Sequence, residues 1–333
     1  MDNLVTALEN EILGKCVGSS LPPLSTSTYT DEKEDGALLR KALLGQTICY
    51  IVSAVVVQEG RVLMMREAKR SCRGTWYLPA GRVEKNESLK EGVIREVREE
   101  TGLNFQPISI ICIDSQETYW FRFTFVGNIT GGKLKSLEEQ DSESMEAGWF
   151  TPSDIFSSLV LRGGDVRPLI DAGIKWYETR QGNPICRSLP VKKPHKNIIF
   201  RLVVVKTQPK DCKKSLFFVL KNGKFGDKSN PHFPYRIVNK FDSMNVISAV
   251  EELMRDINSG ITYKTHGYLS VEHTGKPSGD VDGLCLTLLV EIFIPLEDGI
   301  LNDSYSWFEV KEQDLIDKIW ELIDKGCVEL VQC

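Results

Sequence analysis

The chain has 333 residues, a formal net charge of −5 and a pI of about 5.6. This acidic balance argues against a broad nucleic-acid-binding surface, although a local basic pocket for phosphate groups is compatible with it. The length favours two domains over one, and the 41% share of hydrophobic residues can fill ordinary cores. A small substrate is therefore expected.

Nine cysteines are scattered without a CxxC pair, and with four histidines they form no zinc pattern. We expect reduced thiols inside the cell. The sequence has no basic region followed by an apolar core at its start, and no apolar run approaches about 18 residues. It predicts an intracellular, cytoplasmic protein that neither spans nor binds a membrane.

Residues 1–45 are predicted to form a flexible N-terminal segment. Apolar residues between Leu4 and Leu13 have the spacing of a short amphipathic helix, which would dock on the body or bind a partner. A fraying terminus is the alternative. The stretch 19–36 is rich in Ser, Thr and Pro and then charged, which is typical of a linker.

A β-branched run at 48–57 predicts a central strand, and Gln58-Glu59-Gly60 predicts a turn into a second strand at 62–67. This hairpin is expected to supply the sheet under the helix that follows. The next loop carries three basic side chains, which are either solvated or face substrate phosphates: Lys69, Arg70 and Arg73. Trp76, after this loop, is expected in the core.

The stretch from Gly81 to Leu103, GRVEKNESLKEGVIREVREETGL, predicts a loop followed by an amphipathic helix over about 88–101. Asn86 and Ser88 are alternative N-caps, and Gly102 can end the helix in the left-handed conformation. An apolar stripe that would pack on a sheet recurs every four residues, at Leu89, Val93 and Val97.

Three carboxylates lie within one turn of this helix, at Glu96, Glu99 and Glu100. One interpretation is a solvated face, with Arg95 and Arg98 neutralising part of the charge. The other is a set of hard oxygen ligands for Mg²⁺ or Mn²⁺. The spacing favours the second, because such a pattern of Gly, Arg, Glu and apolar positions should arise by chance less than roughly once in a million.

The pattern from Gly81 to Leu103 matches the Nudix box without a departure, so the chain resembles the Nudix hydrolases, which cleave nucleoside diphosphates linked to another moiety. The longer run EAKRSCRGTWYLPAGRVE, at 67–84, resembles one metazoan branch, the phosphatases of 8-oxo-guanine nucleoside diphosphates. The resemblance implies an α/β (α+β) fold, a Nudix-type α/β/α sandwich with a mixed β-sheet, in a catalytic domain at 46–180.

The resemblance also implies roles for single residues. The metal ligands would be the Ala80 carbonyl and the side chains of Glu96, Glu99 and Glu100, with Mg²⁺ expected and Mn²⁺ as a substitute. Arg95 would orient the glutamates, and the general base would be Glu99 or Glu143, between which the sequence does not choose. Tyr77 would stack on the base, Arg73 and Leu63 are further candidates for substrate contact, and Gly81, Glu87 and Gly102 would be structural.

After the helix, the runs 107–114 and 119–129 predict two strands, with rings on one face at Phe121, Phe123 and Phe125 expected to pack in the core. An acidic loop leads to a strand at Trp149-Phe150. A second helix should then open with Thr151 or Ser153 as its N-cap and Pro152 in its first turn.

The stretch 181–197 is predicted to be a linker, and the order of elements beyond it repeats that of the first domain. Aligning Ser259-Gly260-Ile261 on Thr101-Gly102-Leu103 leaves no metal-binding glutamate: Leu253, Met254, Ile257 and Asn258 stand where Arg95, Glu96, Glu99 and Glu100 do. We therefore interpret 198–333 as a degenerate Nudix-like domain, which would cover the first active site or bind a protein partner.

Three functions compete. The first is hydrolysis of oxidised guanine nucleoside diphosphates to monophosphate and phosphate, which sanitises the nucleotide pool. The second keeps this chemistry for a nucleotide sugar, a dinucleoside polyphosphate or a capped RNA. The third is a nucleotide-sensing binding protein, which would have no need of all three glutamates.

Overall fold

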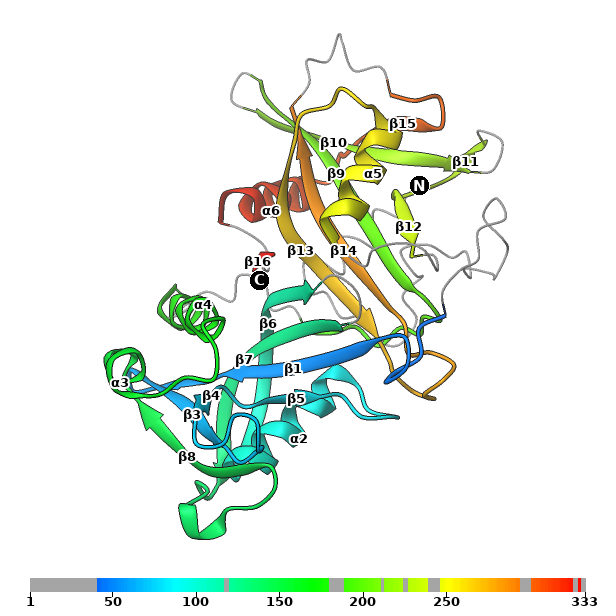
Figure 1. Ribbon diagram of the computed structural model, residues 1–333. Coiled ribbons are helices and arrows are strands. Elements are labelled where there is room, and N and C mark those ends of the chain that lie inside the picture. Colours follow the sequence, from blue (N-terminus) through cyan, green and yellow to red (C-terminus); the bar gives the residue numbers. More distant parts are fainter. Residues whose placement is uncertain are drawn as a thin grey trace. The chain divides into compact units, whose positions relative to one another are not determined.

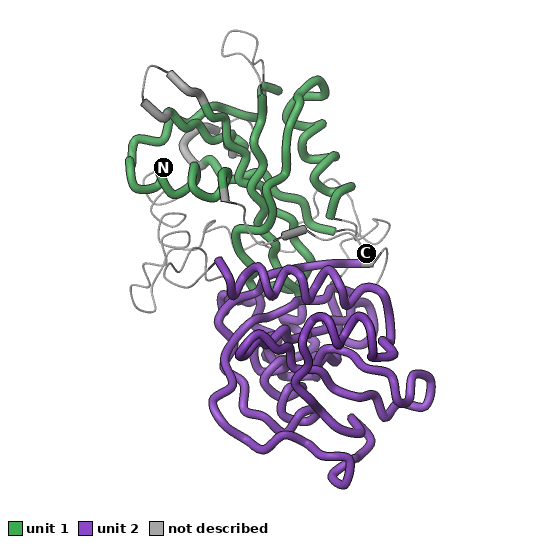
Figure 2. Tube along the Cα trace, turned by 90° about the vertical axis from the view of Figure 1, so that its left-hand side faces the viewer, with its two compact units in different colours: residues 1–41, 195–272, 283–329 green, residues 42–194, 273–282, 330–333 purple. Residues whose placement is uncertain are grey.

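The computed structural model describes residues 41–116, 120–179, 189–210, 213–223, 227–238, 246–293, 301–325 and 329–330. The predictions for residues 1–40 lie outside this range, as does 181–188 of the predicted linker. The chain divides into two compact units (Figure 2). The N-terminal unit is built mainly from Ala42–Pro194 and His273–Asp282, and the C-terminal unit mainly from His195–Glu272 and Gly283–Glu329.

One sheet of the N-terminal unit orders its strands β16-β6-β7-β1-β5 (Figure 1). Its strands are β1 (Cys49–Val55), β5 (Ala80–Arg82), β6 (Leu103–Gln116), β7 (Trp120–Gly132) and β16 (Glu329–Leu330). Strand β1 runs parallel to β7 and antiparallel to β5, with Val52 opposite both Phe123 and Gly81. The expectation of a mixed sheet is confirmed.

A second sheet in this unit is built around β3. Its strands are β2 (Val57–Gln58), β3 (Arg61–Glu67), β4 (Trp76–Tyr77) and β8 (Ser144–Phe150). The expected strand at 48–57 is therefore interrupted at Val56, and its two parts, β1 and β2, belong to different sheets. Glu59 and Gly60 both have positive φ, so the chain turns as predicted, but β1 and β3 then pair in different sheets.

The N-terminal unit also contains η1 (Leu137–Glu139), α3 (Pro152–Ser158) and α4 (Val166–Thr179). Thr151 is the N-cap of α3, where its side chain accepts from the Asp154 N–H, and Pro152 opens the helix as predicted. The rings of Phe121, Phe123 and Phe125 have no exposed surface, so their predicted place in the core is confirmed. Trp76 is half-buried and packs edge-on against Phe150 at 4.7 Å between ring centroids.

Helix α2 (Leu89–Thr101) has defined caps at both ends. Ser88 is the N-cap, in a reciprocal capping box with Glu91, whereas Asn86 lies outside the helix with a left-handed φ of 59°. Gly102 ends the helix with a φ of 76°, as predicted. The apolar stripe faces the core, with no exposed surface at Leu89, Val93 and Val97.

The C-terminal unit contains a sheet ordered β11-β10-β9-β14-β13, with β12 paired to β9 and β15 to β10. Its strands are β9 (Ile198–Lys210), β10 (Lys213–Gly223), β11 (Asp227–His232), β12 (Tyr235–Ile237), β13 (Tyr263–His273), β14 (Leu284–Ile292) and β15 (Tyr305–Glu309). Its helices are α5 (Val246–Ile257) and α6 (Gln313–Lys325).

The strand pairings of the two units correspond. Strand β14 runs parallel to β9 and β12 antiparallel to it, as β7 and β5 do with β1. Strand β15 runs antiparallel to β10, as β8 does to β3. In both units a helix follows the short antiparallel strand. Among the described residues, none of the helices combines the length and hydropathy needed to cross a membrane.

Candidate active site

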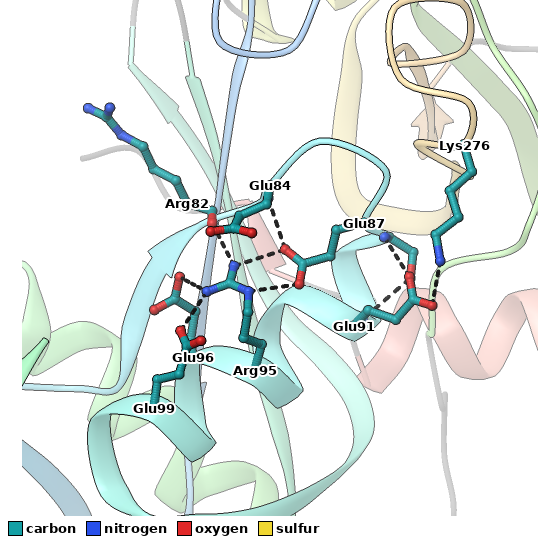
Figure 3. Close-up of polar contacts among 9 residues, drawn as sticks. Arg82, Glu84, Glu87, Glu91, Arg95, Glu96, Glu99 and Lys276 are labelled. Atoms are coloured by element: carbon teal, nitrogen blue, oxygen red, sulfur yellow. Dashed lines mark hydrogen bonds and ion pairs between the residues drawn. The ribbon is translucent and has the colours of Figure 1, made fainter.

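Arg95 joins the loop before α2 to two glutamates of the helix (Figure 3). Its Nε and Nη2 donate to the two carboxylate oxygens of Glu87, each at 2.8 Å. Its Nη1 donates to Glu96 Oε1 at 2.8 Å and to Glu99 Oε2 at 2.9 Å, and Nη2 also reaches the Arg82 carbonyl. The hydrogen bonds to Glu87 make the largest contribution to the raised pKa of Arg95, and those to Glu96 and Glu99 add to it. The guanidinium therefore keeps its positive charge.

Glu100 is fully buried. Its Oε2 accepts the backbone N–H of Ala80 at 2.8 Å, whereas its Oε1 has no hydrogen-bond partner. Burial raises the pKa of Glu100 well above its usual value, and the Ala80 N–H opposes this rise. Leaving a buried carboxylate oxygen without a partner is costly, and a proton, a cation or a water molecule would satisfy it.

Glu96 is 6% exposed and lies against Gly81. A Cβ added at Gly81 would stand 2.1 Å from Glu96 Oε1, so only glycine leaves room for this carboxylate. Burial raises the pKa of Glu96, and Arg95 opposes the rise. The positive charge of Lys69 also opposes the raised pKa of both Glu96 and Glu100. This loop lysine therefore acts electrostatically on both carboxylates.

The last turn of α2 is held by two side chains that follow it in the sequence. Lys135 Nζ donates to the Glu99 carbonyl, and Ser144 Oγ donates to the Glu100 carbonyl at 2.7 Å. These bonds satisfy carbonyls that a helix end leaves without partners. The sequence analysis did not identify either residue, because a single serine or lysine outside the helix carries no spacing signal.

The donor set fits a divalent cation. Glu96, Glu99 and Glu100 offer hard carboxylate oxygens, and the buried Oε1 of Glu100 is free to accept a cation. In the part of the chain that the structure describes, no three His, Cys, Asp or Glu side chains form a ready metal cluster. Two of the three carboxylates, those of Glu96 and Glu99, are engaged by Arg95.

The NUDIX domain family matches residues 49–170. The 8-oxo-dGDP phosphatase NUDT18 of zebrafish (Danio rerio) is 38% identical over 309 residues, which cover 89% of this chain and 90% of the relative. The chain belongs to the Nudix family. The human (Homo sapiens) 8-oxo-dGDP phosphatase NUDT18 is 30% identical, with 96% of this chain and 98% of the relative covered.

Two further Nudix proteins match shorter parts. "Putative nudix hydrolase 1" of Caenorhabditis elegans is 36% identical over 50% of this chain and 47% of its own. A solved NUDIX hydrolase structure from Nitrosomonas europaea is 26% identical, covering 40% of this chain and 90% of that one with a TM-score of 0.34. The domain match and the NUDT18 relatives show that the protein is a Nudix hydrolase, an enzyme that acts on phosphorus anhydrides, and Nudix hydrolases generally need a divalent metal. Helix α2 is its Nudix helix.

Two residues that were expected to contact the substrate, Tyr77 and Leu63, are buried. Tyr77 is 6% exposed, and its hydroxyl donates to Asp165 Oδ2 at 2.6 Å and accepts from Arg122 Nη1 at 2.7 Å. Arg162 lies over its ring at 5.0 Å. The ring therefore packs in the core, and the side chain of Leu63 on β3 has no exposed surface.

Substrate contact by Arg73 and a general-base role for Glu143 stay predictions. Arg73 is exposed, and its guanidinium donates to the Ala68 carbonyl and to Gln140 Oε1, each at 3.2 Å. Glu143 is half-buried, and its backbone N–H donates to Asp141 Oδ1 at 2.9 Å. It directly precedes the serine that holds the Glu100 carbonyl, so its backbone lies beside the last turn of the Nudix helix.

Glu67, at the end of β3, is a further acidic residue of this region that the sequence analysis missed. It is 1% exposed, with Oε1 bound to Arg162 at 2.6 Å and Oε2 without a hydrogen-bond partner. Its charge contributes to the raised pKa of Glu100. No helical spacing links Glu67 to the Nudix helix, so only the fold shows that they interact.

Proposed function

We propose that the protein hydrolyses the diphosphate bond of oxidised guanine nucleoside diphosphates, 8-oxo-dGDP and 8-oxo-GDP, to the monophosphate and phosphate. Such a reaction would keep oxidised nucleotides out of nucleic acid synthesis. The observation that carries the chemistry is the buried Glu100, whose Oε1 lacks a hydrogen-bond partner beside Glu96. The substrate is supported by the names of relatives that match nearly the whole chain.

Mg²⁺, with Mn²⁺ as a substitute, is the cation we propose for this site. Glu96, Glu99 and Glu100 would hold it, and the Ala80 carbonyl would add a backbone oxygen. When bound, the cation offsets the diphosphate charge and lowers the pKa of the attacking water. Nothing in the donor set requires a softer metal, because every donor is an oxygen.

The chain's own residues would provide orientation and a proton acceptor. Arg95 holds Glu96 and Glu99 in one arrangement before the substrate arrives, which reduces the reorganisation needed in the transition state. A carboxylate must accept the proton of the attacking water. Glu99, whose side chain is 43% exposed, and Glu143 are the two candidates, and Lys69 and Arg73 are candidates to meet the phosphates.

We also propose that the C-terminal unit is a degenerate Nudix-like domain. Support comes from the corresponding strand pairings and from α5, which follows β12 in the chain as the Nudix helix follows β5. The residues aligned with the metal site, Leu253, Met254 and Ile257, are buried apolar side chains of α5. A protein partner for this unit and a cytoplasmic location stay predictions.

The test is phosphate release by the purified chain with Mg²⁺, on 8-oxo-dGDP, 8-oxo-dGTP, dGDP, ADP-ribose and diadenosine polyphosphates. Glu100→Gln should lower turnover by on the order of a hundredfold or more while leaving the fold intact, because it removes a transition-state charge contact. Glu138→Gln, at an exposed glutamate of η1, is the matched control and should behave as the wild type.

A preference for 8-oxo-dGDP would support the proposed reaction and substrate. Preference for ADP-ribose or a dinucleoside polyphosphate would keep the chemistry and reject the substrate. Turnover no higher than that of Glu100→Gln on every compound would reject the enzyme and favour a nucleotide-binding protein.

A further inference from the structure

A segment from the second half of the sequence contacts the loop that leads into the Nudix helix. This segment, His273–Asp282, belongs to the N-terminal unit; it begins at the last residue of β13 and ends before β14. Lys276 Nζ donates to Glu91 Oε1 at 2.6 Å (Figure 3), and the backbone N–H of Ser278 donates to Asn86 Oδ1 at 2.8 Å. We call His273–Asp282 the docking segment.

The docking segment also meets the loop backbone. A Cβ added at Gly275 would stand 2.5 Å from the carbonyl oxygen of Glu87, so the two backbones are in close contact. Gly275 has a φ of 67°, which an L residue rarely adopts. Glycine at this position is thus needed for both the conformation and the approach.

Buried groups anchor the two ends of the docking segment. The Asp282 side chain accepts the backbone N–H groups of Leu44 and Gly279, both at 2.9 Å, and its carbonyl accepts the hydroxyl of Tyr50 at 2.7 Å. At the other end the His273 ring meets the ring of Tyr50 edge-on at 5.1 Å between centroids. Tyr50 has no exposed surface and belongs to β1, so the segment is tied to the sheet of the Nudix domain.

The contacted loop residues lead directly to the proposed metal ligands. Asn86 has a left-handed φ of 59°, an uncommon conformation for a residue other than glycine, and its side chain is held by the docking segment. The next residue, Glu87, binds Arg95 through both oxygens. Arg95 in turn binds Glu96 and Glu99.

We propose that the docking segment is a positioning element of the active site. It fixes the loop at Asn86 and Glu87, and through Arg95 it sets where the glutamates stand. A small displacement of such groups reduces turnover strongly, since a misplacement of about 1 Å can cost on the order of a hundredfold. The role in turnover rests on the proposed hydrolase function, whereas the role in holding the loop can be measured without it.

Two glycines of the segment offer a matched pair of variants. Gly275 and Gly279 both have positive φ, 67° and 90°, so alanine is strained at either position. Only at Gly275 would the new methyl group strike the Glu87 carbonyl, because nothing lies within 4 Å of a Cβ at Gly279. Gly275→Ala should lower kcat about tenfold or more with an unchanged KM for the nucleotide, and Gly279→Ala should keep the wild-type kcat.

Hydrogen exchange of the backbone amides of residues 84–92 is the second readout. Gly275→Ala should speed this exchange in the full chain, and Gly279→Ala should not. Asn86→Gly gives an independent variant, because glycine tolerates the left-handed conformation and removes only the side chain that accepts the Ser278 N–H. It should also speed exchange and lower kcat.

Equal exchange rates for Gly275→Ala and Gly279→Ala would overturn the proposal. So would a wild-type kcat for both Gly275→Ala and Asn86→Gly, whatever the exchange, since the segment would then hold the loop without positioning the site. If the wild-type chain hydrolyses none of the nucleotides, the proposed function fails. The exchange rates then still decide whether the segment holds the loop.

Discussion

Gly81 illustrates how one residue can matter for chemistry more than for folding. Its place in the Nudix box was visible in the sequence, but the reason for it was not. The structure supplies the reason: the carboxylate of Glu96 occupies the space that a Cβ at Gly81 would fill. Because that carboxylate is the far end of a flexible side chain, it can move aside at little cost to the fold.

Gly81→Ala should therefore separate activity from stability. We expect a loss of turnover on the order of a hundredfold, because Glu96 is displaced from the proposed metal site, with a melting temperature close to that of the wild type. Gly164→Ala is the control, since nothing lies within 4 Å of a Cβ there. Phosphate release and thermal melting measure the two effects, and an active Gly81→Ala would contradict the assignment of Glu96.

At the scale of the single residue, helical spacing predicts which side chains share one face of a helix, but it does not predict which side chains meet across strands and loops. Glu96, Glu99 and Glu100 follow from the helix period. The burial of Tyr77 was not predictable, because its partners Asp165 and Arg122 come from distant parts of the chain. Pairing between β-strands and loops, rather than local periodicity, determines such contacts.

The Nudix helix is the element that the sequence predicts best. Ser88 and Gly102 carry local cap signals, and the structure uses both. The hairpin at 48–67 shows the opposite case, because alternation and turn residues identify two strands without showing that they belong to different sheets. Sheet membership depends on partners far away in the sequence.

The start of the Nudix helix should show a pH dependence that comes from Lys276. Its hydrogen bond to Glu91, helped by the capping bond from Ser88, lowers the pKa of Glu91 from 4.5 to about 2. A carboxyl group whose pKa is lower in the folded than in the unfolded chain stabilises the fold at pH values above its unfolded pKa. For Glu91 this stabilisation is lost as the pH falls from 4.5 towards about 2. Lys276→Met should therefore lower the melting temperature at pH 6 more than at pH 3.5.

The effect should be small, because both partners are about half-exposed and such pairs contribute at most about 1 kcal/mol. Lys133→Met is the control. It removes a more exposed ion pair, from Lys133 Nζ to Glu139, whose side chains are 80% and 43% exposed, so the same dependence on pH should be weaker there. Thermal melts at both pH values, at low and high salt, measure the difference. If Lys276→Met lowered the melting temperature more at pH 3.5 than at pH 6, the ion pair with Glu91 would not be the cause of the effect.

At the scale of the whole molecule, the repeated order of elements was readable from the sequence. The predicted strands and the predicted helix at 246–258 follow the same order as in the first domain, although no family motif marks them. The strand pairings of the two units correspond. The docking segment could not be predicted in the same way. A Gly-, Pro- and Ser-containing stretch such as 273–282 looks like any loop, and its assignment to the N-terminal unit depends on contacts that no local pattern encodes.

If the C-terminal unit is a Nudix-like domain without metal ligands, divalent cation binding should depend on the Nudix helix alone. The double variant Glu96→Gln with Glu100→Gln should weaken Mn²⁺ binding by on the order of tenfold or more, since even less direct changes around metal sites have effects of this size. Glu251→Gln, at an exposed glutamate of α5, should bind Mn²⁺ as the wild type does.

Calorimetric titration of the metal-free full chain with Mn²⁺ measures this affinity without any substrate. The aligned positions on α5 carry Leu253, Met254 and Ile257, whose buried apolar side chains offer no oxygen to a cation. A site of unchanged affinity that persists in the double variant would place metal binding outside the Nudix helix. A weakened site in Glu251→Gln would give α5 a metal-binding role, and the degenerate assignment would then be wrong.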